Sequence, residues 1–407
     1  MKKFLFTLVL SILFSAPIVF SQCPNNISFY SQADIDNFPI NYPNCTEIEG
    51  FVQINGEDIT NLYGLSNIES VGQDLIINNN PLLTSLEGLE NLISVDDFFL
   101  DISYNDALIN LSGLNNLTSV FLLNISNNNS LTSLYGIENL TIIEQGLSIH
   151  RNNALLDMSG LENIIYIKGG VTISENNGLS NLDGINQLDS IGGSLTLKKN
   201  FFLQDISALS NLTKIGTHLI INKCNDLTNL TGLENLISIG GRLDIYENND
   251  LESLEGIDNI ASQSISNLKI TVNPVLSICE VNSICEYLFN PNGDIEVHTN
   301  SDGCNNSAEI EYECTVSVGE ILPSDQLTLY PNPFSKSTNI EYILEQPSTV
   351  QIIIYNHFGE QVEVIQQQQC SGLQKVTWNA IGQPSGVYYF RLQVGDNMTS
   401  GKMVLVK

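Results

Sequence analysis

The stretch LTNLTGLENLISIGGRLDIYEN, residues 227–248, contains the two phrases that decide the fold. The first phrase recurs in near copies, such as LTSLEGLENLISV and LTSLYGIENLTII. The second phrase, of the form LxIxxN, occurs nine times at steps of 23 to 25 residues. Self-similarity at this period is typical of a solenoid, in which each unit packs only against its neighbours.

The LxI alternation has the period of a β-strand, so Leu243 and Ile245 point inward while their neighbours face solvent. We therefore predict an all-β solenoid of about nine 24-residue turns, each giving one strand to a parallel sheet. The residue that closes the strand is Asn in eight of the nine units and Cys224 in the other. We interpret this column as a buried ladder whose amides bond to backbone groups that the sheet leaves unpaired.

Charge divides the chain into two parts. From Gln22 to Asp325 there are 8 basic residues against 40 acidic ones, a balance of −32, whereas the remainder has 5 of each. This break predicts a domain boundary, with residues 316–325 as the linker and residues 326–407 as a separate domain. The acidity argues against nucleic acid or anionic lipid as partners, because their phosphates would be repelled.

The first 21 residues have the charged, apolar and small-residue regions of a secretory signal peptide. After them, no apolar run reaches the roughly 18 residues that a transmembrane segment needs. We therefore expect an exported protein with no transmembrane segment.

Six cysteines flank the repeats, and in an exported chain they indicate disulfides. We predict an N-terminal cap over residues 22–50, a repeat solenoid over 51–275 and a C-terminal cap over 276–315. Cys23 and Cys45 are the natural pair of the first cap. The cysteines of the second cap allow three connectivities that the sequence does not separate: Cys279, Cys285, Cys304 and Cys314. No spacing for a zinc site is present, so we expect no metal and no cofactor.

The outward positions of the predicted sheet are mostly small and polar. Six of the eight basic residues of the acidic part lie on or beside these strands: Arg151, Lys198, Lys199, Lys223, Arg242 and Lys269. One hypothesis is a polar, charge-graded face that binds a glycan or a protein, with Tyr246 as a stacking platform. Its candidate binding residues are His150, Arg151, Lys198, Arg242, Asp244 and Tyr246. The alternative is that this face is merely solvated and that the lysines keep the protein soluble.

The entry segments CTEIEGFVQING (45–56) and ITNLYGLSNIESVGQDLIINNN (59–80) resemble the receptor L-domain family. The resemblance covers roughly residues 23 to 315 and implies a single-stranded, right-handed, leucine-rich-repeat-like β-helix. The array is longer and more regular than one receptor L domain, so the resemblance implies the fold far more than hormone binding.

In the tail, alternating apolar runs separated by Gly, Asn and Pro turns predict a small Ig-like β-sandwich. Three motifs resemble the type A C-terminal sorting domain of the type IX secretion system: YPNP (330–333), GVYY (386–389) and the final GKMVLVK (401–407). The sorting-signal residues are Pro331, Asn332, Pro333, Gly386, Tyr388 and Lys407. The resemblance implies recognition by that secretion machinery, passage across the outer membrane, cleavage near the linker, and attachment to the surface or release.

None of the common catalytic motifs is present, including GxSxG, HExxH, GxxxxGK[ST] and GxGxxG. We therefore expect no catalytic residues and a non-enzymatic protein of the cell surface or extracellular space, acting in adhesion or recognition of an unknown glycan or protein ligand. Two alternatives stay open: a polysaccharide hydrolase or lyase on a solenoid scaffold, which would need paired carboxylates in a cleft, and a structural surface-coat protein.

Overall fold

The computed structural model describes residues 23–317, 327–344, 347–394 and 397–407. The predicted signal peptide and residues 318–325 of the predicted linker lie outside the described residues.

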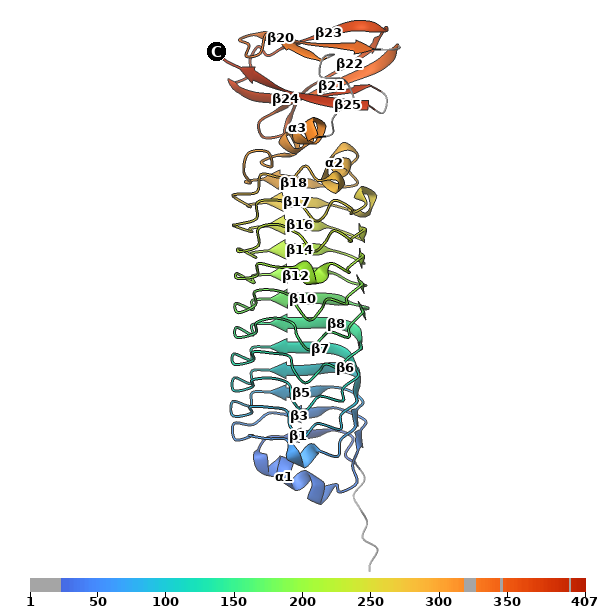
Figure 1. Ribbon diagram of the computed structural model, residues 1–407, viewed down its shortest axis with the longest axis vertical. Coiled ribbons are helices and arrows are strands. Elements are labelled where there is room, and N and C mark those ends of the chain that lie inside the picture. The colour runs from blue at the N-terminus through green and yellow to red at the C-terminus, as the bar shows by residue number, and fades with distance from the viewer. Residues whose placement is uncertain (1–22, 318–326, 345–346, 395–396) are drawn as a thin grey trace, which may run out of the picture.

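Twelve parallel strands stack into one long sheet that runs the length of the solenoid (Figure 1). In stacking order they are β1 (Ile27–Phe29), β3 (Val52–Ile54), β5 (Leu75–Asn78), β6 (Ser94–Ser103), β7 (Ser119–Ser126), β8 (Ile142–His150), β10 (Gly170–Ser174), β12 (Leu195–Lys198), β14 (Leu219–Asn222), β16 (Leu243–Tyr246), β17 (Leu268–Thr271) and β18 (Ile295–His298). The solenoid is therefore longer than the nine turns predicted. The extra strands β1, β3 and β18 lie in or next to the caps, where the sequence departs from LxIxxN.

A buried asparagine in nearly every turn joins that turn to its neighbours. Asn152 donates its backbone N–H to Asn176 Oδ1 at 2.9 Å, and its Nδ2 donates to the carbonyl of Ile125 in the preceding turn at 2.9 Å. The same pattern begins where Gly56 N–H meets Asn80 Oδ1 and ends at Asn300, beyond the predicted repeats. The ladder predicted from the sequence is present, and at its far end it reaches into the C-terminal cap.

Cys224 occupies the ladder position of its turn. Its backbone N–H donates to Asn248 Oδ1 at 3.0 Å, like that of an asparagine in this column. Burial raises the pKa of its thiol to about 12, so the group stays protonated at neutral pH. Cys224 is thus a packed ladder residue and not a nucleophile.

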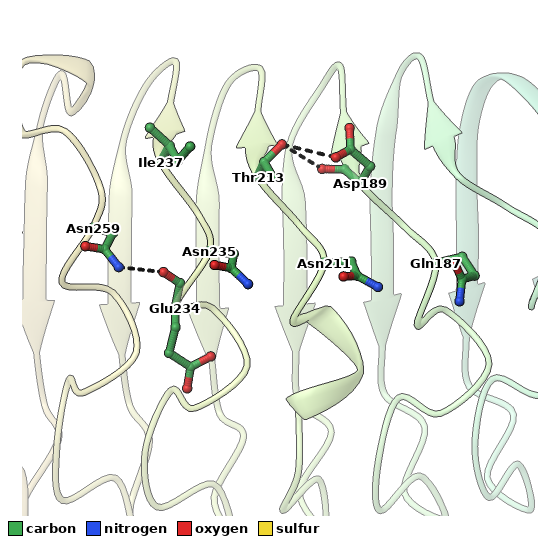
Figure 2. A pocket seen from close by; sticks show the side chains of 8 residues that line it. All are labelled: Gln187, Asp189, Asn211, Thr213, Glu234, Asn235, Ile237 and Asn259. Carbon is green, nitrogen blue, oxygen red and sulfur yellow. Dashed lines mark hydrogen bonds between the residues drawn. The ribbon is translucent and has the colours of Figure 1, made fainter.

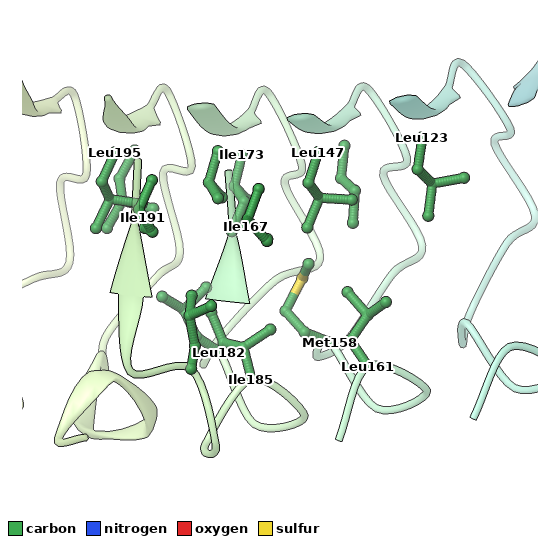
Figure 3. Close-up of a cluster of buried hydrophobic side chains, with 14 of the residues drawn as sticks. Leu123, Leu147, Met158, Leu161, Ile167, Ile173, Leu182, Ile185, Ile191 and Leu195 are labelled. Atoms are coloured by element: carbon green, nitrogen blue, oxygen red, sulfur yellow. The ribbon is translucent and has the colours of Figure 1, made fainter. Parts of the chain in front are cut away.

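Leucine and isoleucine side chains from every turn fill a single continuous core. Figure 3 shows this core in the middle of the solenoid, where Leu147, Met158 and Leu182 are all almost fully buried. The glycine of the first phrase adopts a positive φ, for example +112° at Gly184, and a side chain there would collide with the carbonyl of Met158. Two turns differ: at Gly64, and at Ala208 where this glycine is missing, the chain forms the 3₁₀ helices η1 (Tyr63–Leu65) and η2 (Ser207–Leu209).

A second stack of two-residue strands forms another side of the solenoid. It consists of β2 (Glu47–Ile48), β4 (Ser70–Val71), β9 (Tyr166–Ile167), β11 (Ser190–Ile191), β13 (Lys214–Ile215) and β15 (Ser238–Ile239). Between β4 and β9, the long strands β6, β7 and β8 belong to both stacks. The corner between the two sides is therefore built differently in these three turns.

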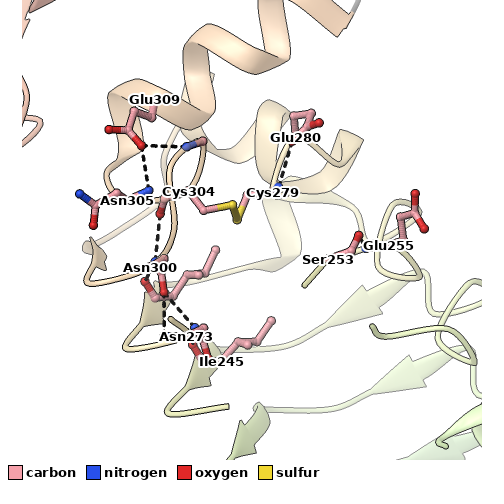
Figure 4. Close-up of a disulfide and its surroundings, with 12 residues drawn as sticks. Ile245, Ser253, Glu255, Asn273, Cys279, Glu280, Asn300, Cys304, Asn305 and Glu309 are labelled. Carbon is pink, nitrogen blue, oxygen red and sulfur yellow. Dashed lines mark hydrogen bonds between the residues drawn. A yellow bond between two sulfur atoms is a disulfide. The ribbon is translucent and has the colours of Figure 1, made fainter. Parts of the chain in front are cut away.

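Short helices and disulfides close the two ends. At the first end, α1 (Gln32–Asn41) buries Ile35 and Phe38, and Cys23 pairs with Cys45. The other end carries α2 (Asn282–Phe289) and α3 (Ser307–Ser317). There the connectivity that the sequence left open is Cys279–Cys304 and Cys285–Cys314. Figure 4 shows the first of these bonds above the last ladder residues, Asn273 and Asn300.

The tail is the small β-sandwich predicted. One sheet contains β19 (Thr328–Tyr330), β20 (Ser337–Leu344) and β23 (Gly372–Asn379); the other contains β22 (Gln361–Gln369), β21 (Ser348–Asn356), β24 (Gly386–Val394) and β25 (Asn397–Leu405). Its core is aromatic, with Trp378 packed between Phe334 and Tyr388.

Helix α3 of the C-terminal cap lies against the tail (Figure 1). Glu311 on α3 pairs with Arg391 on β24 at 3.4 Å, and the Glu311 side chain is only 10% exposed. Thr315 Oγ1 lies 2.8 Å from Ser400 Oγ, and Asn306 Nδ2 donates to the carbonyl of His357 at 2.9 Å. Burial raises the pKa of Glu311 to about 7, despite the opposing effect of Arg391.

Replacing a ladder asparagine should destabilise the solenoid strongly. Asn248→Ala removes the acceptor for Cys224 N–H, which is then buried without a partner, and it also removes the side-chain donor to the carbonyl of Ile221. We expect a loss of about 2 to 4 kcal/mol in the free energy of unfolding, measured by denaturant titration. The control Asn249→Ala changes an exposed neighbour and should have little effect. Cys224→Asn, which restores the missing amide, should stabilise the protein; if it destabilises, the ladder account is wrong.

The contact between cap and tail should weaken as the pH rises. The docked Glu311 has a pKa near 7, against 4.5 for a free glutamate, so between these values the docked form retains a proton that the undocked form has lost. The contact is then strongest below about pH 4.5 and weakens as the pH rises through 7.

Trp378, the single tryptophan of the chain, reports on the tail alone through its fluorescence. We expect the tail's melting temperature to fall between pH 5 and 8, and Glu311→Gln to flatten this slope. Glu313→Gln, on the same helix, is the control that should leave it unchanged. An unaltered slope in Glu311→Gln would remove this assignment.

Candidate functional site

Two rows of side chains point outward from the main sheet, and the strand register aligns their members. The first row runs Ile76, Asp101, Asn124, Ser148, Thr172, Thr196, Ile220, Asp244 and Lys269; the second runs Asn78, Ser103, Ser126, His150, Ser174, Lys198, Asn222, Tyr246 and Thr271. We call this surface the main-sheet face. Because neighbouring strands lie about 4.8 Å apart, each row is a nearly regular array.

His150 and Arg151 lie at the end of β8, where the chain turns. His150 is half-buried, and burial, with a further contribution from the charge of Arg151, lowers its pKa. Arg151 has φ +57°, as do the residues at this bend in the neighbouring turns, so its side chain points along the stack. In the described part of the chain, no hydrogen-bond partner orients the His150 ring.

Arg151 belongs to a row of ion pairs along the bends. Its Nε lies 2.7 Å from Glu175 Oε2, and Lys199 Nζ lies 2.9 Å from the other oxygen of the same carboxylate. These two hydrogen bonds lower the pKa of Glu175 to about 2. One turn further, Lys223 pairs with Glu247 at 3.0 Å. Most of the positive charge at this edge is therefore neutralised within the protein.

Near the end of the solenoid, Arg242, Asp244 and Tyr246 lie on or beside β16. Asp244 is almost buried, with 10% of its side chain exposed, and the Arg242 guanidinium lies 3.7 Å away. Burial raises the pKa of Asp244, although Arg242 and Lys269 oppose this effect. Lys269 Nζ lies 5.5 Å from the centre of the Tyr246 ring, so this ring already has a cation over one face.

Lys198 differs from the other basic residues of the main-sheet face. It is exposed, and within the described residues it has no ion pair. It lies two strands from His150 and two strands from Tyr246, hence roughly 10 Å from each along the sheet. The six residues chosen from the sequence thus form separated groups on an open face and do not converge on one cavity.

Sequence reasoning missed a hollow of about 440 Å³ in the first half of the main-sheet face. Its lining consists of Asp74, Ile76, Phe99, Asp101, Leu122, Asn124 and Ser148. The sequence does contain a signal for this hollow, in the segment that joins the second stack to the main sheet. Compared with most other turns, this segment has one residue more in the turn of β6 (Val95 to Leu100) and one residue fewer in the turn of β7 (Val120 to Leu123).

A second hollow, of about 460 Å³, lies on another side of the solenoid (Figure 2). There Asn211, Asn235 and Asn259 form an external row, and each donates its Nδ2 to a backbone carbonyl of the preceding turn at 2.7 to 2.8 Å. Thr213 Oγ1 likewise bonds to the carbonyl of Asp189 at 3.2 Å. Because these donors already have partners, the row contributes to the stacking of turns.

The sorting-signal residues of the tail gather around its last strand. Asn332 donates its Nδ2 to the carbonyl of Lys402 and accepts the N–H of Val404, both at 2.8 Å, and thereby fixes the YPNP segment, with Pro331 and Pro333, along β25. Gly386 begins β24 opposite Leu405. Tyr388 and Lys407 donate to the carbonyls of residues 384 and 383, respectively. The tail motifs are therefore brought together at the C-terminal strand.

Comparison with known families matches two parts of the chain. Residues 44–119 match the receptor L domain, and residues 328–407 match the secretion system C-terminal sorting domain. A search of curated proteins gave no match. Both resemblances predicted from the sequence are thus confirmed, although the first match covers only the beginning of the solenoid.

The fold and the tail together define a secreted surface protein. Its sorting domain directs it through the type IX secretion system to the cell surface or the extracellular space. Its cargo is a β-solenoid similar to a receptor L domain. Within the described ranges, no helix is long and apolar enough to cross a membrane, and no cluster of three or more His, Cys, Asp or Glu side chains suits a metal ion.

Breaking the Arg151–Glu175–Lys199 group should change the charge of the surface more than the stability. In Glu175→Gln we expect a loss below about 1 kcal/mol in the free energy of unfolding, because the side chains are partly exposed. The small contribution of the wild-type carboxylate should disappear as the pH falls from 4.5 towards 2, since its folded-state pKa is lowered. Urea titration at pH 7 and pH 3 measures both effects, and a loss above 2 kcal/mol at pH 7 would contradict them.

Proposed function

We propose that the solenoid is a non-enzymatic binding module that the cell displays or releases for adhesion or recognition. The observation that carries this proposal is the main-sheet face itself: it is open, and its outward side chains are mostly polar and held in register across the nine strands from β5 to β17. Such a surface suits an extended ligand that makes many small contacts, in the manner of a glycan or a protein surface.

The division of the chain supports the same proposal. The solenoid, from about residue 22 to residue 315, is the acidic cargo, and residues 326–407 serve export. Disulfides at both ends protect the stack outside the cell, where reducing conditions are absent. A polysaccharide hydrolase or lyase would need converging carboxylates, and a coat protein would need self-association.

A glycan array and a panel of surface proteins, probed with the full mature chain, test the proposal directly. We expect saturable binding without product formation from a polysaccharide. Cleavage of a polysaccharide would contradict the non-enzymatic part of the proposal, and assembly into sheets or filaments without any bound ligand would favour a coat protein.

Charge reversal tests whether the main-sheet face is the surface used. Lys198→Glu combined with Arg242→Glu should weaken binding of the ligand found on the array by about 3- to 30-fold, more at low salt than at high salt, because both charges steer association. The control is Lys214→Glu, an exposed lysine on the second stack. Surface plasmon resonance at two salt concentrations measures the effect. If the double variant and the control bind equally well, the binding surface lies elsewhere.

A further inference from the structure

The strand register of the solenoid shifts at one corner, in the turns of β6 and β7. The register of β6 against β7 shifts between Val95 and Phe99, and that of β7 against β8 shifts between Val120 and Leu122. Irregularities of this kind redirect side chains and are over-represented next to functional sites. Here they leave Phe98 and Phe99 about half exposed, at 47% and 46%.

Asp74 of the preceding turn fixes the position of Phe99. The Phe99 N–H donates to Asp74 Oδ1 at 3.0 Å, which satisfies a backbone donor that the shifted register would leave unpaired. The ring therefore lies at the rim of the hollow described above, together with Ile76 and Leu122. A half-exposed aromatic ring on a backbone held by Asp74, beside two aliphatic side chains, forms an apolar platform on the main-sheet face.

The other side of the hollow is polar and already ordered. Asp101 accepts hydrogen bonds from Ser103 Oγ at 2.9 Å and from Asn124 Nδ2 at 2.5 Å. This network fixes the Asp101 carboxylate and the Asn124 amide. In the described part of the chain, Asn124 Oδ1 and Ser148 Oγ make no hydrogen bond, so both can serve a ligand.

These groups define the chemistry of the occupant. Two carboxylates line the hollow, Asp74 and Asp101, and no ion pair neutralises either of them within the described residues, so an anionic ligand would be repelled. A ligand with hydroxyl groups can donate to carboxylate and amide oxygens and accept from a serine hydroxyl. A ligand with an apolar face can pack on Phe99. Pyranose rings combine both features, and the volume lies within the range of small-ligand sites.

We propose that this hollow is a binding subsite for a neutral hexopyranose unit of a polysaccharide, with Phe99 as the stacking ring and Asp101, Asn124 and Ser148 as hydroxyl partners. This inference rests on the proposed binding function and assigns it a place and a ligand class. The hollow lies beside His150 on the main-sheet face, so a longer chain bound here would continue over the following strands.

Isothermal titration of the full mature chain with neutral hexasaccharides tests the subsite, using maltohexaose, cellohexaose, laminarihexaose and mannohexaose, with oligogalacturonate as the anionic comparison. We expect at least one neutral probe to bind more tightly than the anionic one. Phe99→Ala should weaken that binding at least 10-fold, Ser148→Ala about 3-fold, and Phe99→Trp should retain it. Phe98→Ala removes an equally exposed ring that does not line the hollow and should have no effect.

The outcomes separate this inference from the proposed function. If a neutral saccharide binds and Phe99→Ala binds it as well as the wild type does, the subsite is wrong while glycan binding stands. If no saccharide binds but a protein ligand from the surface panel does, the saccharide subsite falls and the binding function stands. If neither class of ligand binds, both proposals fall. The circular dichroism spectrum and melting temperature of Phe99→Ala should match those of the wild type, because its backbone bond to Asp74 does not depend on the ring.

Discussion

The solenoid depends on a column of buried side-chain amides, one in nearly every turn. A ladder asparagine such as Asn152 accepts a backbone N–H from the turn before it, and donates both to a carbonyl of that turn and, through its own N–H, to the next asparagine. An apolar residue in this position would leave a buried backbone N–H without its acceptor and would remove a donor to a buried carbonyl. The ladder thus makes each turn a copy of its neighbour and fixes the spacing of everything on the surface.

The ladder also helps to divide the positions of each repeat into those that the structure constrains and those that are free to vary. The inward Leu and Ile positions, the ladder position and the glycine of the first phrase all have a defined packing or backbone requirement, whereas the outward positions have none. Variation is therefore free to accumulate on the main-sheet face. At the bends, charged residues occupy some of these variable positions and form ion pairs with residues one turn away, as in Arg151, Glu175 and Lys199. At the corner of β6 and β7, another such variable position exposes the ring of Phe99.

Much of the fold could be predicted because the same two sequence phrases recur in turn after turn. The LxI alternation and the closing asparagine predicted the strands and the ladder, and the three tail motifs predicted the export domain. The length was underestimated because β1, β3 and β18 carry altered forms of the repeat phrase. Strand β18 begins the segment IEVHTN (295–300), which keeps the spacing and the closing asparagine, whereas β1 is recognisable only by its pairing with β3. Disulfide connectivity in the second cap could not be predicted, since it depends on how α2 and α3 pack against each other.

The candidate site was harder to predict for two physical reasons. Pairing across turns cancels charges that look isolated in the sequence, although the spacing of 24 residues between Arg151, Glu175 and Lys199 would have revealed it. The hollow arises from one added and one missing residue at neighbouring corners, a change that is invisible when each repeat is aligned only by its phrases. The shape of the hollow depends on the strict stacking of the turns on either side.

Hydrogen exchange at the backbone amides of the ladder tests that stacking most directly. The N–H groups of Asn105, Asn128, Asn152 and Asn176 each donate to the side chain of the next ladder residue in the buried interior. The account predicts that they exchange as slowly as the central strand amides, through unfolding of the stack. Exchange as fast as that of the exposed loops, while the adjacent strands stay protected, would contradict it and show that the asparagines do not hold the turns together.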